Sequence, residues 1–555
     1  MLLALPDDVR EKIMVRVLSD GHIYNWVMWL HRGPSVARTV LGPGSLSRNG
    51  DAYRLVAESF RATRSPNRTT WAAVVAELRR EWQAAKEEMT LPRINYNIFV
   101  HACMHNLPMV VDYHLANFAN PNSRFDNRLD DAREPVLWIA CRRGNVEMVK
   151  KLLAAGADVD GRPEGNPDYE TTPLMAAIDG GGLGGGGSSD RLTQILLDAK
   201  ANTECRDSDG FTALIGATFA GNAAVVKTLI AGNANVDAVS HDGHTALMHA
   251  CAAAGAAAVA NNRMEIMQAL LAHGAKVDAC DHEGQTALYV AALAAKVDAV
   301  NALLAYGANP NTVAKSPTPL TTAVRFSDGE TDVVEALLAA GAEIDTPGRN
   351  GCTALIHATR KGYVKCAQVL LRHGATVDAR DDDNGSALTW ACANGECAMA
   401  KILLDARADI NFRQDWCKET PLILASRSTD NWTGMVELLV ANGANVNLAT
   451  RTGYTALCTA SSRHQHKVAK VLIDGRADLE ARTTFGHTAL DIACEKGSIQ
   501  TVNVLIAAGA NVNTRCKLGK SALFRASKES VVEALRNAGA VDDEQDGHFR
   551  MVIGE

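Results

Sequence analysis

Apolar residues recur along most of the chain in a unit of about 33 residues, and each unit predicts two short apolar helices. The clearest mark of the unit is the tripeptide Ser/Thr-Ala/Pro-Leu. It begins at Thr172, Thr212, Thr245, Thr286, Thr318, Thr353, Ser386, Thr420, Thr455, Thr488 and Ser521. Successive starts lie 40, 33, 41, 32, 35, 33, 34, 35, 33 and 33 residues apart. This regularity predicts an array in which each unit buries its apolar face against its neighbours.

The unit HTALDIACEKGSIQTVNVLIAAGANVNTRCKLG, which starts at His487, illustrates the predicted elements. Thr488 can cap a first helix that begins at Ala489 and contains the small apolar run LDIAC. Gly497 ends that helix, and VNVLIAA predicts a second one. Gly509 then supplies the left-handed residue that terminates many helices. The following ANVNTRCKLG is expected to turn back as an extended hairpin.

Composition fits thin layers of small-residue helices better than one thick core. Hydrophobic residues make up 47% of the chain but aromatic residues only 5%, and the net charge is −7. That charge gives no general attraction to nucleic acid, and no run reads as a membrane span. The opening MLLALP meets Asp7 and Asp8 at once, too early for a signal peptide. The 13 scattered cysteines argue against an oxidising compartment, so we expect a cytoplasmic or nuclear protein.

The repeated motifs T-A-L or T-P-L, A-A or A-C, and L-L-x-x-G-A-x-V-D/N closely resemble those of the ankyrin repeat family. The resemblance covers roughly residues 95–540, about a dozen repeats of which the first and last are degenerate. Degenerate early units are IFVHACMHNLPMVVDYHLANFANPN and EPVLWIACRRGNVEMVKKLLAAGADVD. The resemblance to the ankyrin repeat family implies an all-α solenoid with a helix-turn-helix and a β-hairpin in each repeat. It also implies recognition of protein partners without catalysis.

Several repeats depart from the pattern. The helix-terminating glycine is replaced by Lys200, Asn233, Arg407 and Arg476. A left-handed Lys or Arg should cost about 1 kcal/mol or more, so these layers should be softer or take another path. Four repeats carry insertions that we place between their two helices. The insertions lie around Gly184, Gly255, Asp328 and Trp432.

No catalytic, cofactor or metal site stands out from the repeat register, so we predict that the chain is not an enzyme. Cysteines fall at the second small position of the A-A pair, where a thiol serves as a small buried group. They are Cys103, Cys141, Cys251, Cys392 and Cys494. His249, His273 and His357 also occupy recurring positions and are interpreted as structural. The run GGGLGGGG, Gly180–Gly187, lacks the Lys-Ser/Thr of a phosphate loop and is interpreted as a flexible insertion.

Partner binding is the more promising source of function. In the ankyrin family, partners are usually contacted by hairpin tips and by the last residues of the first helices, on the concave side. Those helix ends carry Arg325, Arg360, Lys361, Arg427 and Arg463, and nearby tips add Trp416, Tyr454 and Phe485. An acidic, partly aromatic protein segment would suit such a surface. The alternative is that these are ordinary solvated positions whose charge is cancelled by neighbours such as Asp381–Asp383.

Residues 1–94 do not follow the repeat and predict a separate small helical domain. Val9, Ile13 and Val17 form an apolar stripe behind Pro6, which suits a first helical turn. The opening LPDDVREKI resembles the start of an F-box, and YRLVAESFRATRSPNRTTWAAVV, from Tyr53, resembles its later part.

The F-box resemblance implies contacts with a Skp-type adaptor, and hence a substrate receptor of a cullin ubiquitin ligase. The implied contact residues are Leu5, Pro6, Val9, Ile13, Val56 and Phe60. The alternative is that residues 1–94 only cap the stack of a stand-alone scaffold or inhibitor. An enzyme within residues 1–94 is a third, weaker alternative. Residues 541–555 are expected to be an acidic flexible tail.

Overall fold

The computed structural model describes residues 119–127, 132–164, 171–179, 188–252, 257–312, 317–414, 417–427 and 433–541, with a few single positions between 99 and 116. The chain divides into two compact units. Unit 1 comprises Met1–Ala250 with Ala254–Lys276, and unit 2 comprises Cys251–Ala253 with Val277–Glu555. The predicted contacts Leu5, Pro6, Val9, Ile13, Val56 and Phe60 lie outside the described residues, as do Trp416 and the 542–555 part of the tail.

A hydroxyl side chain begins most first helices, as the sequence predicts. The Oγ1 of Thr353 accepts a hydrogen bond from the backbone N–H of Ile356 at 3.4 Å, and Ser386 does the same for Thr389. The small residues that follow are buried, including Ala354 and Ala387. Because the cap fixes the start and the small residues allow close approach, first helices within a unit pack directly on one another, as α20 (Ala354–Lys361) does on α22 (Ala387–Asn394).

In unit 1, a short sheet precedes paired helices. Strands β1 (Arg124–Asn127) and β2 (Ala132–Pro135) pair antiparallel. The first helices are α8 (Val136–Arg142), α10 (Pro173–Asp179), α12 (Ala213–Phe219) and α14 (Ala246–Cys251). The second helices are α9 (Val146–Ala154), α11 (Ser188–Asp198), α13 (Ala223–Ala231) and α15 (Ala257–Ala272).

Unit 2 continues the same helix-turn-helix plan. The first helices are α16 (Ala287–Leu293), α18 (Pro319–Phe326), α20 (Ala354–Lys361), α22 (Ala387–Asn394), α24 (Pro421–Ala425), α26 (Ala456–Ser462), α28 (Ala489–Glu495) and α30 (Ala522–Arg525). The second helices are α17 (Val297–Ala305), α19 (Asp332–Ala339), α21 (Val364–Arg372), α23 (Cys397–Asp405), α25 (Thr433–Ala441), α27 (His466–Asp474), α29 (Ile499–Ala507) and α31 (Glu529–Asn537).

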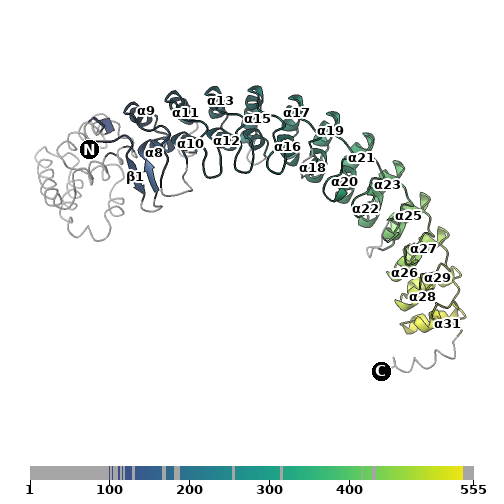
Figure 1. The fold of residues 1–555 in the computed structure, drawn as a ribbon. Coiled ribbons are helices and arrows are strands. Elements are labelled where there is room, and N and C mark those ends of the chain that lie inside the picture. Colours follow the sequence, from purple (N-terminus) through teal and green to yellow (C-terminus); the bar gives the residue numbers. More distant parts are fainter. Residues whose placement is uncertain are drawn as a thin grey trace, which may run out of the picture. The chain divides into compact units, whose positions relative to one another are not determined.

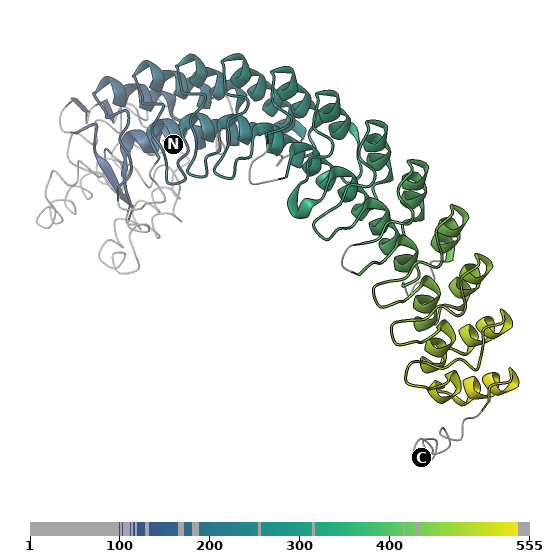
Figure 2. The ribbon, with the colours of Figure 1, turned by 45° about the vertical axis from the view of Figure 1, so that its right-hand side comes forward.

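Within each unit, first helices contact first helices and second helices contact second helices, which makes two layers (Figure 1). The hairpin loops project beyond the first-helix layer (Figure 2). The insertions fall between the two helices of a repeat, where the sequence places them: between α10 and α11, α14 and α15, α18 and α19, and α24 and α25. The fold is therefore the all-α repeat array that the sequence predicts.

A ladder of side-chain hydrogen bonds joins successive hairpins. The Asp or Asn that ends the motif L-L-x-x-G-A-x-V-D/N accepts a hydrogen bond from a backbone N–H of the next repeat. Asp378 accepts from Asp409 at 2.9 Å, and Asn411 accepts from Asn445 at 2.8 Å. The short polar side chain recurs in the sequence because it satisfies a neighbouring backbone donor.

Candidate interaction surface

Among the described first helices, the fourth residue after the cap is buried in some, such as Thr322 in α18, and partly exposed in others. His249 in α14, Val290 in α16, His357 in α20 and Trp390 in α22 share this position, and all four are half-buried. The predicted basic residues end two neighbouring first helices: Arg325 lies in the last turn of α18, and Arg360 and Lys361 lie in the last turn of α20. Neighbouring repeats therefore place these two sets of side chains together.

Arg360, in the last turn of α20, is held by the next repeat. Its guanidinium lies over the Trp390 ring, 4.4 Å from the ring centroid, and its Nη1 donates to Cys352 Sγ at 3.5 Å. Trp390 in turn donates from Nε1 to Asp381 Oδ2 at 2.7 Å. The other oxygen of Asp381 accepts from the backbone N–H of Gly385 at 2.7 Å. Asp381 is buried and engaged with Trp390, so it orients the ring on which the arginine stacks.

Arg325, Arg360 and Lys361 surround an uncharged histidine. Burial, together with the positive charges of Arg325, Arg360 and Lys361, lowers the pKa of His357 to about 4. The imidazole is therefore neutral near pH 7. Within the described residues, none of the three cations forms an ion pair with a carboxylate. We call Arg325, His357, Arg360, Lys361 and Trp390 the basic cluster.

The other predicted surface residues do not join the basic cluster. Arg427 has its own carboxylate, since its Nη1 lies 3.2 Å from Glu419 Oε1. Arg463 is exposed just after α26, and Tyr454 is half-buried in a hairpin of the same repeat. Phe485 is 64% exposed at the next hairpin tip. The sequence thus predicts one line of basic residues, whereas the structure gathers three of the five.

Unit 1 contains a cluster of aromatic and imidazole rings that the sequence pattern does not predict. Phe219, 62% exposed at the end of α12, lies 6.0 Å from Phe211 and 5.9 Å from His249 between ring centroids. His244 completes the group, 5.5 Å from His249. Burial lowers the pKa of His249 to about 4, with smaller contributions from His244 and Arg263. The shared register of His249 and His357 is the signal that could have revealed both sites.

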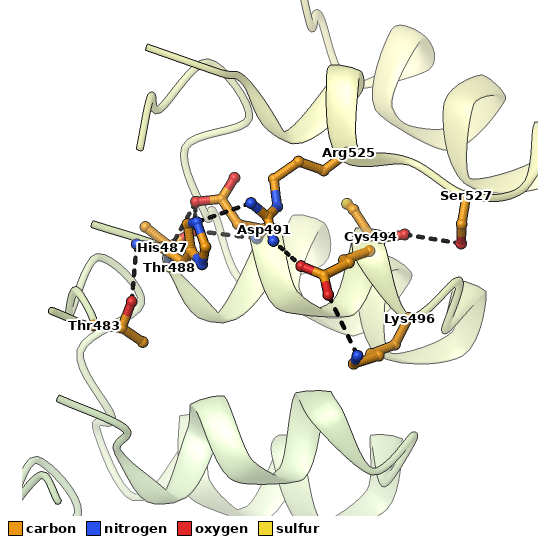
Figure 3. A network of polar contacts seen from close by, with 9 residues as sticks. Thr483, His487, Thr488, Asp491, Cys494, Lys496, Arg525 and Ser527 are labelled. Atoms are coloured by element: carbon orange, nitrogen blue, oxygen red, sulfur yellow. Dashed lines mark hydrogen bonds and ion pairs between the residues drawn. The ribbon is translucent and has the colours of Figure 1, made fainter. Parts of the chain in front are cut away.

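A polar network in the last repeats resembles a catalytic set but has structural roles (Figure 3). Arg525 Nη1 lies 2.8 Å from His487 Nε2, and the same guanidinium pairs with Glu495. Asp491 accepts from the backbone N–H of Thr488 at 2.9 Å, which closes a capping box at the start of α28. Burial raises the pKa of Asp491 and lowers that of His487. Both groups serve helix ends and repeat contacts.

The predicted structural cysteines are buried. Cys103, Cys141, Cys392 and Cys494 have no exposed surface and Cys251 has 2%. Burial raises the pKa of the Cys494 thiol to about 12, so it stays protonated. Within the described residues, no group of three or more His, Cys, Asp and Glu side chains could hold a metal ion. The described helices also include none long and apolar enough to cross a membrane.

Comparisons with known proteins agree with the repeat architecture. The family model described as Ankyrin repeats (3 copies) matches residues 99–184, 185–257, 255–348, 320–414 and 408–483, and the model described as Ankyrin repeat matches residues 485–517. No curated protein matches the chain. Among solved structures, it is similar to the human ASB11 ankyrin repeat domain, with 26% identity and a TM-score of 0.36 over 40% of this chain and 99% of that one.

The ankyrin repeat domain of Bcl-3, described as a unique member of the IkappaB protein family, is a second similar structure. It has 28% identity and a TM-score of 0.37, again over 40% of this chain and 99% of that one. The family models match most of the chain between residues 99 and 517. The chain therefore belongs to the ankyrin repeat family, whose repeats are protein–protein interaction modules.

Proposed function

We propose that this chain is the substrate receptor of a cullin-type ubiquitin ligase in the cytoplasm or nucleus. In this proposal the basic cluster of unit 2 binds an acidic segment of the substrate, and residues 1–94 bind a Skp-type adaptor. The observation that carries the substrate-binding half is the group of three cations without carboxylate partners among the described residues. Ankyrin repeat proteins are generally non-catalytic scaffolds, so the ubiquitin chemistry would belong to the recruited enzymes.

The geometry of Arg360 favours binding of a carboxylate. A guanidinium stacked on an aromatic ring loses little mobility on binding, and its N–H edge still offers paired donors. Arg325 is likewise placed over a ring, 5.1 Å from the Phe326 centroid, and Phe326 is 44% exposed. An acidic segment that also carries an aromatic or aliphatic side chain could use both the charges and the exposed rings.

A display library of acidic 15-residue peptides, selected on the full chain, tests the substrate-binding half. The Arg360→Ala, Lys361→Ala double variant should weaken the binding of selected peptides by about tenfold to a hundredfold, because each lost charge contact contributes about 0.7–1.4 kcal/mol. Arg372→Ala is the matched control, since Arg372 lies in the same repeat on the second helix, with its side chain 71% exposed. Equal weakening by both variants would contradict a local site.

The recruitment half rests on the residues that resemble an F-box. Full-length chain is mixed with a purified Skp-type adaptor and cullin, and co-elution is measured by size-exclusion chromatography. Wild type should co-elute, whereas a Val9→Asp, Ile13→Asp variant should not. If the folded wild type also fails to co-elute, residues 1–94 cap the array and the chain is a stand-alone scaffold or inhibitor.

A further inference from the structure

The hairpin tips of the last three repeats are basic and carry no acidic residue. The tip segments 449–455, 482–488 and 515–521 contain no Asp or Glu, whereas the tip at 380–385 reads RDDDNG. Arg451, Lys517 and Lys520 are exposed on these final tips. Lys520 lies over the Phe524 ring, with its Nζ 3.3 Å from the centroid. These tips therefore present positive charge without acidic residues in the same segments.

Two large apolar side chains are exposed among these charges. Phe485 is 64% exposed and Leu518 is 80% exposed. Their tips are joined, because the backbone N–H of Lys517 donates to the carbonyl of Phe485 at 3.1 Å. The preceding tip is joined in the same way, from Thr484 N–H to the carbonyl of Thr452 at 3.0 Å. We call Arg451, Phe485, Lys517, Leu518 and Lys520 the tip surface.

The end of the chain matches the tip surface in charge and apolar content. Residues 542–555 read DDEQDGHFRMVIGE, with four acidic residues in the first five positions and four apolar residues between 549 and 553. The described chain ends against the last hairpin, since the Val541 N–H donates to Oδ1 of Asn513, two residues before the last tip segment, at 2.9 Å. Fourteen residues can span about 45 Å when extended, and successive repeats lie about 10 Å apart. The segment is therefore long enough to reach all three tips.

We propose that residues 542–555 dock on the tip surface of their own chain. The acidic half would lie against Arg451, Lys517 and Lys520, and the apolar half against Phe485 and Leu518. The covalent link gives the segment an effective concentration of order millimolar, so a weak contact would suffice to keep it bound. Any external acidic partner of these tips would then have to displace it. This proposal does not depend on the function of the basic cluster.

A labelled peptide of residues 541–555 provides the test, with binding measured by fluorescence anisotropy. It is titrated onto the wild-type full chain and onto a full chain with the tail neutralised by Asp542→Asn, Asp543→Asn, Glu544→Gln and Asp546→Asn. The neutralised chain should bind the peptide about tenfold more tightly, because its own tail no longer competes. Adding Lys517→Glu and Leu518→Ser to it should reverse that gain, whereas Arg349→Glu, at an earlier exposed tip, should not.

Three outcomes would overturn the proposal. The peptide could bind the wild-type and neutralised chains equally, which would mean that the tail does not occupy its site. Binding could persist after Lys517→Glu and Leu518→Ser, which would place the site elsewhere. Sedimentation could show a dimer that disappears when the tail is neutralised, which would mean that the segment docks on a second copy. Circular dichroism of each variant confirms that the comparison is made between folded chains.

Discussion

Replacing Arg407 with glycine should stabilise the array. Arg407 follows α23 and has φ 65°, the left-handed region that Lys200, Asn233 and Arg476 also occupy. Its backbone completes the helix end, with its N–H donating to Leu404 O at 2.9 Å. The left-handed conformation costs an L-residue about 1–2 kcal/mol, and glycine would remove this strain. Glycine also gains conformational freedom in the unfolded chain, which lowers stability by about 0.5–1 kcal/mol. Arg407→Gly should therefore gain about 0.5–1 kcal/mol.

Amide hydrogen exchange of α23 and α25 is a suitable assay, because repeat arrays open locally and need not unfold in one step. Arg407→Gly should raise protection there by about two- to fivefold. Arg407→Ala should change little, since the side chain is exposed and the strain persists. Gly374→Ala, at φ 89° with open space around its Cβ position, should lower protection after α21. Lower protection in Arg407→Gly, or an equal rise in Arg407→Ala, would refute the strain argument.

Three further changes test the fold. The lowered pKa of His249 means that the unfolded chain binds more protons between about pH 6.5 and 4, so stability should fall over that window as pH decreases. After allowance for partial exposure, the free energy of unfolding should fall by about 1–2 kcal/mol between pH 7 and pH 4.5. His249→Val should remove most of this difference, as urea unfolding at the two pH values would show. Asp378→Ala should lower the free energy of unfolding by about 1 kcal/mol, because the Asp409 N–H loses its acceptor. Asp378→Asn keeps an acceptor and should lower it much less, which the midpoints of urea unfolding would show. Thr488→Ala should cost about 1–2 kcal/mol by opening the capping box with Asp491, measured as reduced protection of α28.

The repeat architecture could be predicted because its local signals agree with its packing. Thr353 caps its helix, and Gly509 adopts the left-handed conformation, φ 89°, that the sequence assigns to it. The substituted ends at Lys200 and Arg407 keep the same path, so the strain is held by packing. Softness of these layers stays a prediction.

One detail of the helix ends depends on a neighbouring repeat. In DGRAD, Gly475 precedes the left-handed Arg476 and has φ −78°. A Cβ at Gly475 would lie 2.8 Å from Val440 Cγ1 of the previous repeat. Glycine is therefore required there by close approach and not by its own backbone angle, a distinction that needs the packed structure.

The candidate surface was less accessible to prediction. The basic residues could be identified from their register, but their pairing depends on side-chain directions across repeats. Arg427 carries the same pattern as Arg360, yet it pairs with Glu419 while Arg360 stacks on Trp390. The sequence allows Asp381 to act as a charge that cancels the basic surface, whereas in the structure its side chain is buried and accepts a hydrogen bond from the Trp390 indole. The F-box resemblance stays a prediction, since it lies outside the described residues.

Quantitative affinity capture from cells with three forms of the full chain tests the account most directly. The forms are wild type, Arg360→Glu with Lys361→Glu, and Val9→Asp with Ile13→Asp. We expect the second form to lose the substrate protein that carries the acidic segment and to keep the Skp-type adaptor and cullin. The third form should lose the adaptor and cullin and keep the substrate protein. Capture of the same proteins by all three folded forms would contradict the account.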